Sequence, residues 1–160
     1  MILGRGGSGK SVLARRLGQA AGLPVTELDT LFWQEGLTTP DPARWAQCQR
    51  NLIRAEAWIL DGDLGPTGYA LADRLRAADT VIVLDFGLFR CTWRTLCRGR
   101  ERGDYWRWMR GYRRHSLPAV MQAVMIHAPQ ATVRQLRNPR QVRQFLAAIG
   151  PPPAAGTRQP

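Results

Sequence analysis

A glycine-rich segment near the start of the chain is where residue types and spacing most directly predict chemistry. Residues 4–11, GRGGSGKS, match the pattern G-x-x-x-x-G-K-[ST], with a strand-like segment before them and a helix-like segment after them. Glycines let several backbone N–H groups point at one phosphate, and the following helix N-terminus adds partial positive charge. We therefore predict a phosphate-binding loop. Its predicted contact residues are Gly4, Gly6, Gly7, Ser8, Gly9, Lys10, Ser11 and Val12.

The last two residues of this pattern carry the groups expected to contact phosphate and metal. Lys10 is the only lysine among 23 basic residues, and its slim ammonium group fits a phosphate cradle better than a planar guanidinium does. In such loops the lysine reaches the β- and γ-phosphates of a nucleotide, and the hydroxyl, here that of Ser11, binds Mg²⁺. A glycine-rich turn that matches by chance is the alternative, and the agreement of strand, loop and helix disfavours it.

Three aspartates, Asp29, Asp61 and Asp85, end the strand-like segments VTELD, WILD and VIVLD. Because the carboxyl ends of parallel strands form the ligand edge of a sheet, all three carboxylates can face the phosphate-binding loop. A metal-bound triphosphate needs a carboxylate for Mg²⁺ or its waters, and an acceptor hydroxyl needs one to orient it or take its proton. Aspartates that only cap the next turn are the alternative, which we favour most for Asp85.

Short β-type segments alternate with helix-type segments, which is typical of an α/β fold with a parallel sheet covered on both faces. We predict one domain over residues 1–149 and a disordered, proline-rich tail over 150–160. The predicted strands, each expected to be buried on both faces, are Met1–Leu3, Pro24–Asp29, Trp58–Asp61, Thr80–Asp85 and Ala131–Leu136.

Helix signals lie between these strands. The predicted helices are Lys10–Ala21, one opening at Asp41 with Pro42 in its first turn, Tyr69–Ala77, Phe89–Arg100, Asp104–Ile126 and Pro139–Ile149. We expect Val12, Leu13 and Leu17 to lie on the buried side of the first helix. We also expect Pro118 to interrupt or kink the predicted helix Asp104–Ile126.

The chain is strongly basic, with a net charge of +11, and its arginines are concentrated after residue 89. Residues 90–114 hold nine arginines against Glu101 and Asp104, which predicts an anionic group nearby, either of a small ligand or of a polymer. Arg90, Arg94 and Arg98 follow one another by one helical turn, so they share a face that can turn towards the loop. A solvated basic face is the alternative.

Aromatic residues interleaved with these arginines leave a second interpretation open. Tyr105, Trp106, Trp108 and Tyr112 could stack on a single strand of nucleic acid while the arginines neutralise it. Helical spacing places Tyr105, Trp108 and Tyr112 on one stripe, and such a stripe is more often packing. We therefore treat nucleic acid as the less favoured partner.

Other features argue against several classes of protein. No apolar run approaches the ~20 residues of a membrane helix, and the chain does not start with a charged segment followed by an apolar one. We expect a cytoplasmic protein with no membrane partner. Cys48, Cys91 and Cys97 lack C-x-x-C spacing and histidine partners, which argues against disulfides and structural zinc.

Six segments together resemble a P-loop kinase of the adenylate-kinase-like group, and most closely the family of DNA topology modulation proteins. They are GRGGSGKS, ELDTLFW (27–33), WILDGD (58–63), ADTVIVLDF (78–86) followed by Cys91 and Arg94, YRRHSLP (112–118) and VRQLRNPRQVRQFL (133–146). The loop is specific for phosphate, whereas LDTLFW and WILDG are more diagnostic of the family. The chain departs from its relatives at Asp63 and Leu64, where they usually have Asn and Tyr, and in a shorter lid at 98–104.

This resemblance implies a three-layer P-loop NTPase sandwich with a five-stranded parallel sheet of order 2-3-1-4-5 and an arginine-rich lid at about 98–114. Asp61 resembles the aspartate near Mg²⁺, and Asp29 resembles the carboxylate on the acceptor side. The resemblance assigns Arg94, Arg98, Arg113 and Arg114 to the transferred phosphoryl group, and we add Arg137 to the nucleotide site. We expect Arg140 and Arg143, on the last helix, to lie away from the loop.

The leading hypothesis is thus an ATP-binding, Mg²⁺-dependent phosphotransferase acting on a small molecule or a nucleotide. The alternative is a nucleic-acid-associated, NTP-binding regulator of DNA topology with slow or no ATP hydrolysis. Specific nucleic-acid binding predicts saturation on defined DNA and a steep loss of affinity with salt, which separates the two.

Overall fold

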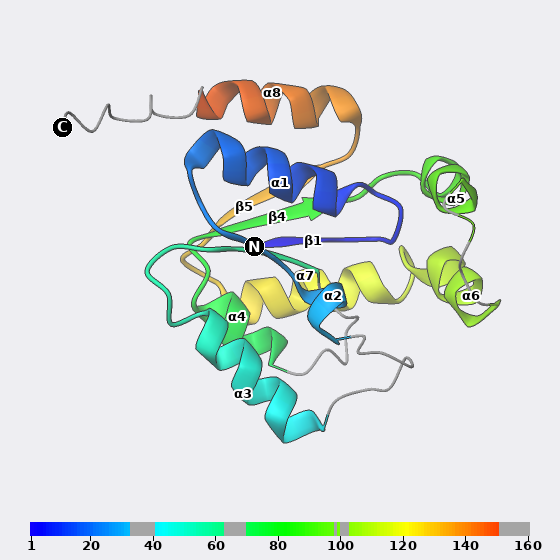
Figure 1. The fold of residues 1–160 in the computed structure, drawn as a ribbon. Coiled ribbons are helices and arrows are strands. Elements are labelled where there is room, and N and C mark those ends of the chain that lie inside the picture. The colour runs from blue at the N-terminus through cyan, green and yellow to red at the C-terminus, as the bar shows by residue number, and fades with distance from the viewer. Residues whose placement is uncertain (33–40, 63–69, 98, 100–102, 151–160) are drawn as a thin grey trace.

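The computed structural model describes residues 1–32, 41–62, 70–97, 99 and 103–150, and the strands among them form one five-stranded parallel sheet (Figure 1). The strands are β1 (Ile2–Gly4), β2 (Val25–Glu27), β3 (Ile59–Asp61), β4 (Thr80–Leu84) and β5 (Thr132–Leu136). Their order is β2-β3-β1-β4-β5, so the predicted α/β fold and strand order are confirmed. Parallel pairing sets Gly4 opposite Leu84 and Glu27 opposite Asp61, which aligns the carboxyl ends of these strands at one edge.

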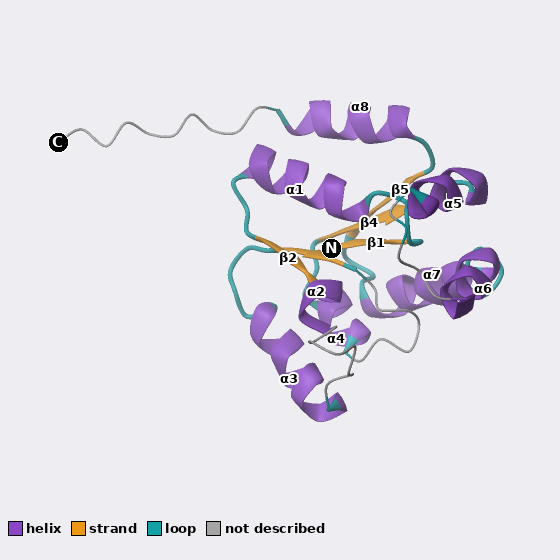
Figure 2. Ribbon diagram, turned by 45° about the vertical axis from the view of Figure 1, so that its right-hand side comes forward, coloured by secondary structure: helices purple, strands orange, loops and turns teal. Residues whose placement is uncertain are grey.

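Helices cover both faces of the sheet and its carboxyl edge. The helices are α1 (Lys10–Ala21), α2 (Leu28–Phe32), α3 (Pro42–Leu52), α4 (Leu71–Arg76), α5 (Leu88–Leu96), α6 (Gly103–Gly111), α7 (Ser116–His127) and α8 (Pro139–Ile149). Helices α1 and α8 lie on one face, and α3, α4 and α7 lie on the other (Figures 1 and 2). Helices α5 and α6 lie beyond the carboxyl edge, where β1 runs into the phosphate-binding loop (Figure 2).

The two-residue period of the central strands explains this three-layer arrangement. Ile2 and Ile82 point to the face covered by α1 and α8, whereas Leu3 and Val83 point to the face covered by α4 and α7. All four side chains are at most 1% exposed. Because β1 and β4 bury both faces, they read as continuous apolar runs, and they hold the loop that follows β1 on a rigid base.

Several helix boundaries follow from local sequence. Asp41 caps α3 by accepting a hydrogen bond from the backbone N–H of Arg44 at 2.9 Å, and Pro42 occupies the first turn as predicted. Gly22 ends α1 in the left-handed region, with φ of 69°. No helix in the described part of the chain combines the length and apolar character needed to cross a membrane.

The structure corrects four sequence predictions. Asp29 does not end a strand but lies in the first turn of α2. Strand β5 is not buried on both faces, because its first three residues are exposed. The predicted helix 104–126 breaks at residues 112–115, and Pro118 instead lies in the first turn of α7, where its missing N–H needs no partner. Val12 is 44% exposed and does not join the core.

Candidate functional site

The phosphate-binding loop adopts a backbone that several of its glycines make accessible. Gly7 and Gly9 have φ values of 71° and 95°, in the region that favours glycine. Gly9 caps α1 without a side-chain hydrogen bond to the first turn, so the N–H groups at this helix end are left to a ligand. The loop thus presents the backbone donors that the sequence motif predicts.

Helices α5 and α6 pack directly against this loop, which gives a second reason for its glycines. A Cβ atom on Gly7 would lie 2.6 Å from the Oγ1 atom of Thr95 in α5, and one on Gly6 would collide with the hydroxyl of Tyr105 in α6. Any side chain at either position would push the helices away. The loop and the two helices at the carboxyl edge therefore form one packed unit.

The ammonium group of Lys10 lies inside this unit. Its Nζ atom donates to the backbone carbonyls of Gly4 at 2.8 Å and Arg5 at 3.3 Å. The positive charge is thereby held within the curve of the loop, where the motif places the phosphates. Lys10 and Gly4, both predicted to contact the nucleotide, therefore lie together.

Asp61, at the end of β3, is a buried carboxylate beside the loop. It is 4% exposed, and its Oδ1 atom has no hydrogen-bond partner among the described residues. Burial raises the pKa of Asp61, while the Ser11 hydroxyl and the Lys10 ammonium group act in the opposite direction. A carboxylate oxygen left without a donor, next to a hydroxyl and a phosphate loop, fits the oxygen ligands that Mg²⁺ takes.

Asp29 lies on the same side of the loop as Asp61 but is exposed. The backbone at Gly62 passes between them, since a Cβ atom on Gly62 would lie 3.5 Å from the Oδ1 atom of Asp29. The negative charge of Asp29 contributes to the raised pKa of Asp61, which is consistent with their proximity. The structure therefore brings together the two carboxylates predicted for metal and acceptor, one buried and one open to solvent.

Asp85, on the other side of the loop, is compensated by protein groups. Its carboxylate accepts hydrogen bonds from Arg113 Nε at 2.8 Å and from Gln135 Nε2 at 3.3 Å. The predicted catalytic residue Arg113 is thus engaged in an ion pair with Asp85, and its neighbour Arg114 is exposed. Their assignment to the phosphoryl group stays a prediction.

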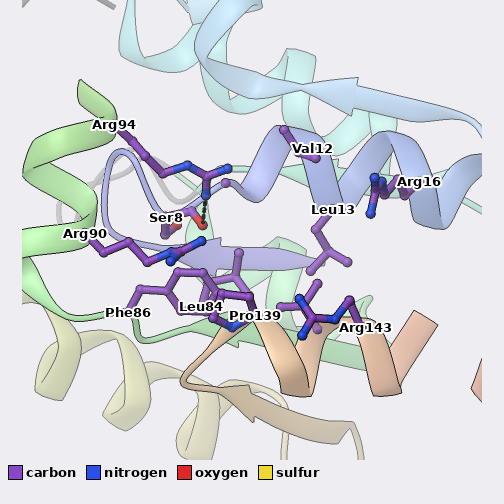
Figure 3. Close-up of a pocket in the computed structure, with 12 residues that line it drawn as sticks. Ser8, Val12, Leu13, Arg16, Leu84, Phe86, Arg90, Arg94, Pro139 and Arg143 are labelled. Carbon is purple, nitrogen blue, oxygen red and sulfur yellow. Dashed lines mark hydrogen bonds between the residues drawn. The ribbon is translucent and has the colours of Figure 1, made fainter. Parts of the chain in front are cut away.

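The arginines of α5 do turn towards the loop. Arg94 donates through Nη1 to the backbone carbonyl of Ser8 at 3.4 Å, and Arg90 lies over the ring of Phe86 at 5.9 Å (Figure 3). Arg98 lies outside the described residues. The face that the sequence assigns to Arg90 and Arg94 is therefore the face that meets the loop.

A cavity of about 340 Å³ extends from the loop between α1, α5 and α8 (Figure 3). This volume lies in the usual range for small-molecule sites. Its lining residues are Ser8, Gly9, Val12, Leu13, Arg16, Leu84, Phe86, Arg90, Arg94, Pro139, Val142 and Arg143. The floor is apolar and the polar side chains around it are largely arginines, which suits a flat base attached to phosphates.

This cavity changes the interpretation of the last helix. Arg143 lines it together with Ser8 and Gly9, although it lies at the end of the cavity away from the loop (Figure 3). Arg143 reaches the cavity because α8 packs on α1 (Figure 1). Val142, Phe145 and Leu146 of α8 pack against the same apolar core as α1. Arg137, predicted to contact the nucleotide, is exposed and donates to Gln135 at 3.1 Å.

Two arginines that the sequence reasoning did not assign are buried at the site. Arg5 is 2% exposed and lies over the ring of Tyr112 at 5.3 Å. Arg74, fully buried, donates from Nη1 to the carbonyl of Gly62 at 2.9 Å and so supports the backbone between Asp29 and Asp61. The arginine inside the glycine-rich motif was a visible signal for Arg5, whereas nothing local marks Arg74.

The aromatic stripe of α6 is packed rather than open. The rings of Tyr105 and Trp108 lie 5.5 Å apart, as do those of Trp108 and Tyr112, and Tyr112 is 1% exposed. With Tyr105 against Gly6 and Tyr112 against Arg5, the stripe supports the loop. The packing interpretation of these three residues is therefore confirmed.

Comparison with known proteins identifies the fold. No protein-family model matches the chain, and no curated protein matches it in sequence. Its structure is similar to a shikimate kinase from Acinetobacter baumannii in complex with shikimate, with a TM-score of 0.66, 16% identity and coverage of 92% of this chain and 88% of that one. It is also similar to a gluconokinase from Sinorhizobium meliloti 1021 (TM-score 0.51, 18% identity, coverage 92% and 90%) and to a deoxyadenosine kinase from M. mycoides with bound dCTP (0.51, 13%, 92% and 95%).

Proposed function

The chain has the fold of P-loop kinases, and we propose that it is an ATP-binding, Mg²⁺-dependent phosphotransferase with a small-molecule or nucleotide acceptor. The observation that carries this proposal is the buried, partner-lacking oxygen of Asp61 beside Ser11 and Lys10 in the phosphate-binding loop. A purely structural loop would have no need of a buried carboxylate oxygen that lacks a hydrogen-bond donor next to it.

The donor nucleotide binds through the loop backbone and Lys10. Its phosphates occupy the loop between Gly4 and Ser11, and its base occupies the cavity above Leu13 and Phe86. Arg94, whose guanidinium already reaches the Ser8 carbonyl, neutralises charge on the phosphates. Val12, exposed on the cavity wall, contributes apolar contact to the same ligand, and Arg137 is kept as a further contact in this proposal.

Mg²⁺ fits the residues on the β3 side of the loop. Ser11 and Asp61 are hard oxygen donors, and the raised pKa of Asp61 means that a cation there removes the cost of the buried charge. When bound, the ion neutralises developing negative charge on the transferred phosphoryl group.

Asp29 is the acceptor-side residue. Its exposed carboxylate, near Gly62 and Asp61, orients a hydroxyl and takes its proton as the phosphoryl group transfers in this proposal. Arg94, Arg98, Arg113 and Arg114 supply positive charge to the transition state in this proposal. For Arg113 this role requires that the ion pair with Asp85 open.

Two finer assignments belong to the proposal as well. The segments ELDTLFW and WILDGD favour membership of the DNA topology modulation family within the P-loop kinases, and we place the protein in the cytoplasm. The nucleic-acid-associated regulator is the other candidate, but the packing of Tyr105 and Tyr112 against the loop disfavours their use as a base-stacking platform. Small-molecule acceptors are therefore the first to screen.

Lys10→Ala tests the proposal. Because the hydrogen bonds of Lys10 within the described part of the chain go to loop carbonyls, the variant should fold normally while ATP turnover with an acceptor, measured by ADP release, falls by about 10³-fold. Arg140→Ala removes the same unit of charge from an exposed position outside the cavity lining and serves as the matched control. Unchanged nucleotide binding and turnover in folded Lys10→Ala protein would refute the proposed site.

A further inference from the structure

The cavity beside the phosphate-binding loop carries more positive charge than a nucleoside triphosphate with an unmodified ribose needs. Four arginines line it, and none of its lining residues is acidic. Arg90 and Arg94 reach in from α5 at the end next to Ser8, where the phosphates bind in the proposed function (Figure 3). The other two, Arg16 and Arg143, lie at the opposite end and need a separate explanation (Figure 3).

Arg16 and Arg143 belong to two helices that bring like charges to the same cavity. Arg16 is on α1 and Arg143 is on α8, and these helices pack through Leu17, Val142 and Phe145. Neither helix contains an acidic residue. Both guanidinium groups line the same cavity, so an anion bound at that end can interact with both.

Neighbouring arginines show how the chain compensates a positive charge where no ligand is expected. Arg15, one residue before Arg16, pairs with Glu27 at 3.0 Å, and Arg76 pairs with Asp73 at 2.9 Å. Arg16 and Arg143 form no ion pair or hydrogen bond with any described residue. Arg16 and Arg143 differ from the other described arginines that lack an ion pair or hydrogen bond in that both line the cavity, at the end away from Ser8.

The position of the pair limits what that anion can be. Arg16 lies seven residues along α1 from Gly9, a rise of about 10 Å from the end that holds the phosphates. The floor between the two ends is formed by Leu13, Leu84 and Val142, so the ligand must lay an apolar or flat group on it. A nucleotide whose base lies on this floor can carry one phosphate at its 5′ end and a second, separate phosphate on its ribose.

We propose that Arg16 and Arg143 form a second anion subsite, which binds a phosphate carried on the 2′ or 3′ oxygen of the ribose of the bound nucleotide. This inference rests on the proposed nucleotide site in the loop and deepens it by naming the class of nucleotide. Guanidinium groups hold phosphate through paired, charge-assisted hydrogen bonds, which an unmodified ribose hydroxyl cannot form as strongly.

The test compares three nucleotides on the wild-type protein by isothermal titration calorimetry with Mg²⁺. They are ADP, adenosine 3′-phosphate 5′-diphosphate and adenosine 2′-phosphate 5′-diphosphate. We expect one of the two ribose-phosphorylated nucleotides to bind roughly tenfold more tightly than ADP, and the arm that does so identifies the oxygen recognised. The advantage should shrink as salt rises, because the subsite is exposed.

Variants assign the effect to the two residues. Arg16→Ala and Arg143→Ala should each reduce the ratio of the ADP dissociation constant to that of the preferred bisphosphate to near one. Arg140→Ala, which removes an exposed arginine of α8 outside the cavity, should keep the wild-type ratio. Thermal denaturation of each variant checks that the fold is intact.

Three outcomes overturn the inference in distinguishable ways. If ADP binds but neither ribose phosphate improves affinity, the subsite is wrong and the nucleotide site stands. If the gain persists in both Arg16→Ala and Arg143→Ala, or falls equally in Arg140→Ala, the extra phosphate is bound by overall charge and not by this pair. If none of the three nucleotides binds, both this inference and the proposed function fail.

Discussion

The two sides of the phosphate-binding loop treat a buried carboxylate in opposite ways. On the β4 side, Asp85 is 7% exposed and receives donors from Arg113 and Gln135. On the β3 side, Asp61 is 4% exposed, and its Oδ1 atom has no hydrogen-bond partner among the described residues. Burial alone therefore does not determine whether both oxygens of an aspartate at this edge receive protein donors.

Asp85 and Asp61 differ in whether protein groups or a bound ligand supply the compensating positive charge. Protein groups complete the environment of Asp85, so its energy does not depend on a ligand. Asp61 retains a desolvation cost, seen in its raised pKa, which a bound cation would remove. A site that is costly when empty gains differential affinity for the ligand that relieves it. The following predictions test this contrast, from the largest expected effect to the smallest.

The largest effect is expected for turnover when Asp61 loses its charge. Asp61→Asn should lower kcat/KM for Mg²⁺-dependent phosphoryl transfer by about 10³-fold, because the amide is a weak metal ligand. Asp85→Asn should lower it by less than tenfold. Steady-state rates over a range of Mg²⁺ concentrations measure both, and equal losses in the two variants would remove the contrast.

A smaller loss is expected when Asp29 is changed, and it should fall on a different step. Asp29→Asn should lower kcat by about 10²-fold, the range for a positioned general base, while ATP affinity changes little because Asp29 acts on the acceptor. Asp61→Asn should instead weaken Mg²⁺-dependent ATP binding. Calorimetric affinities measured beside the rates separate the two roles, and equal effects on ATP affinity contradict the assignment.

The ion pair on the β4 side should appear in stability. Arg113→Ala leaves the Asp85 carboxylate with fewer donors, and because Arg113 is half exposed we expect a loss of about 1 kcal/mol in the free energy of unfolding. Urea denaturation of the two single variants and of the double variant with Asp85→Asn gives the coupling energy.

Turnover in the same variants tests the predicted catalytic role of Arg113. A drop in kcat in Arg113→Ala that persists in the double variant, where the Asp85 carboxylate is also removed, would favour a direct role for Arg113. A rate restored in Arg113→Ala by removing the Asp85 charge would show that Arg113 acts only by compensating Asp85.

The smallest effect is a gain in stability on the β3 side. An acid whose pKa is raised by folding binds its proton more readily in the folded state, so it lowers stability as pH rises from its ordinary value of 3.8 through the raised value. The full cost is present at pH values above the raised pKa of Asp61. Asp61→Asn should therefore raise Tm at neutral pH, by about 2–4 °C for each kcal/mol of destabilisation that is relieved. It should also flatten the dependence of Tm on pH below neutral pH.

Calorimetric scans of the ligand-free protein at pH 4.5 and pH 7 measure this change. Asp85→Asn is the matched control and should lower Tm, because it removes a compensated charge that Arg113 pairs with. A Tm that falls in Asp61→Asn as well would mean that Asp61 is stabilised by its surroundings, and the proposed strain on the empty site would be wrong.

Much of the fold and part of the site could be predicted from sequence, because local residue types determine them. The Gly9 turn, the Asp41 cap and the Gly22 end each follow from conformations that particular residues favour within a few positions. The apolar runs of β1 and β4 required a central position in the sheet, which they have. The motif itself predicted where Lys10 and Ser11 lie.

The prediction failed where a residue's environment comes from distant parts of the chain. Asp29 was assigned to a strand end because its segment is apolar, but the backbone turns into α2 one residue earlier. Arg143 was expected only to lie on the last helix, away from the loop, and the packing of α8 on α1 is what makes it part of the cavity lining. Sequence distance contains no information about such contacts.

The sequence by itself determined the phosphate-binding loop and the order in which strands and helices alternate, since these follow from backbone preferences and side-chain periodicity over short windows. Only the tertiary structure decided which aspartate is compensated, because the partners of Asp85 come from residues 28 and 50 positions later in the chain. It also decided that Arg16 and Arg143 share one cavity. The physical reason is that desolvation and charge compensation depend on which side chains surround a group in space, and packing of the layers sets those neighbours.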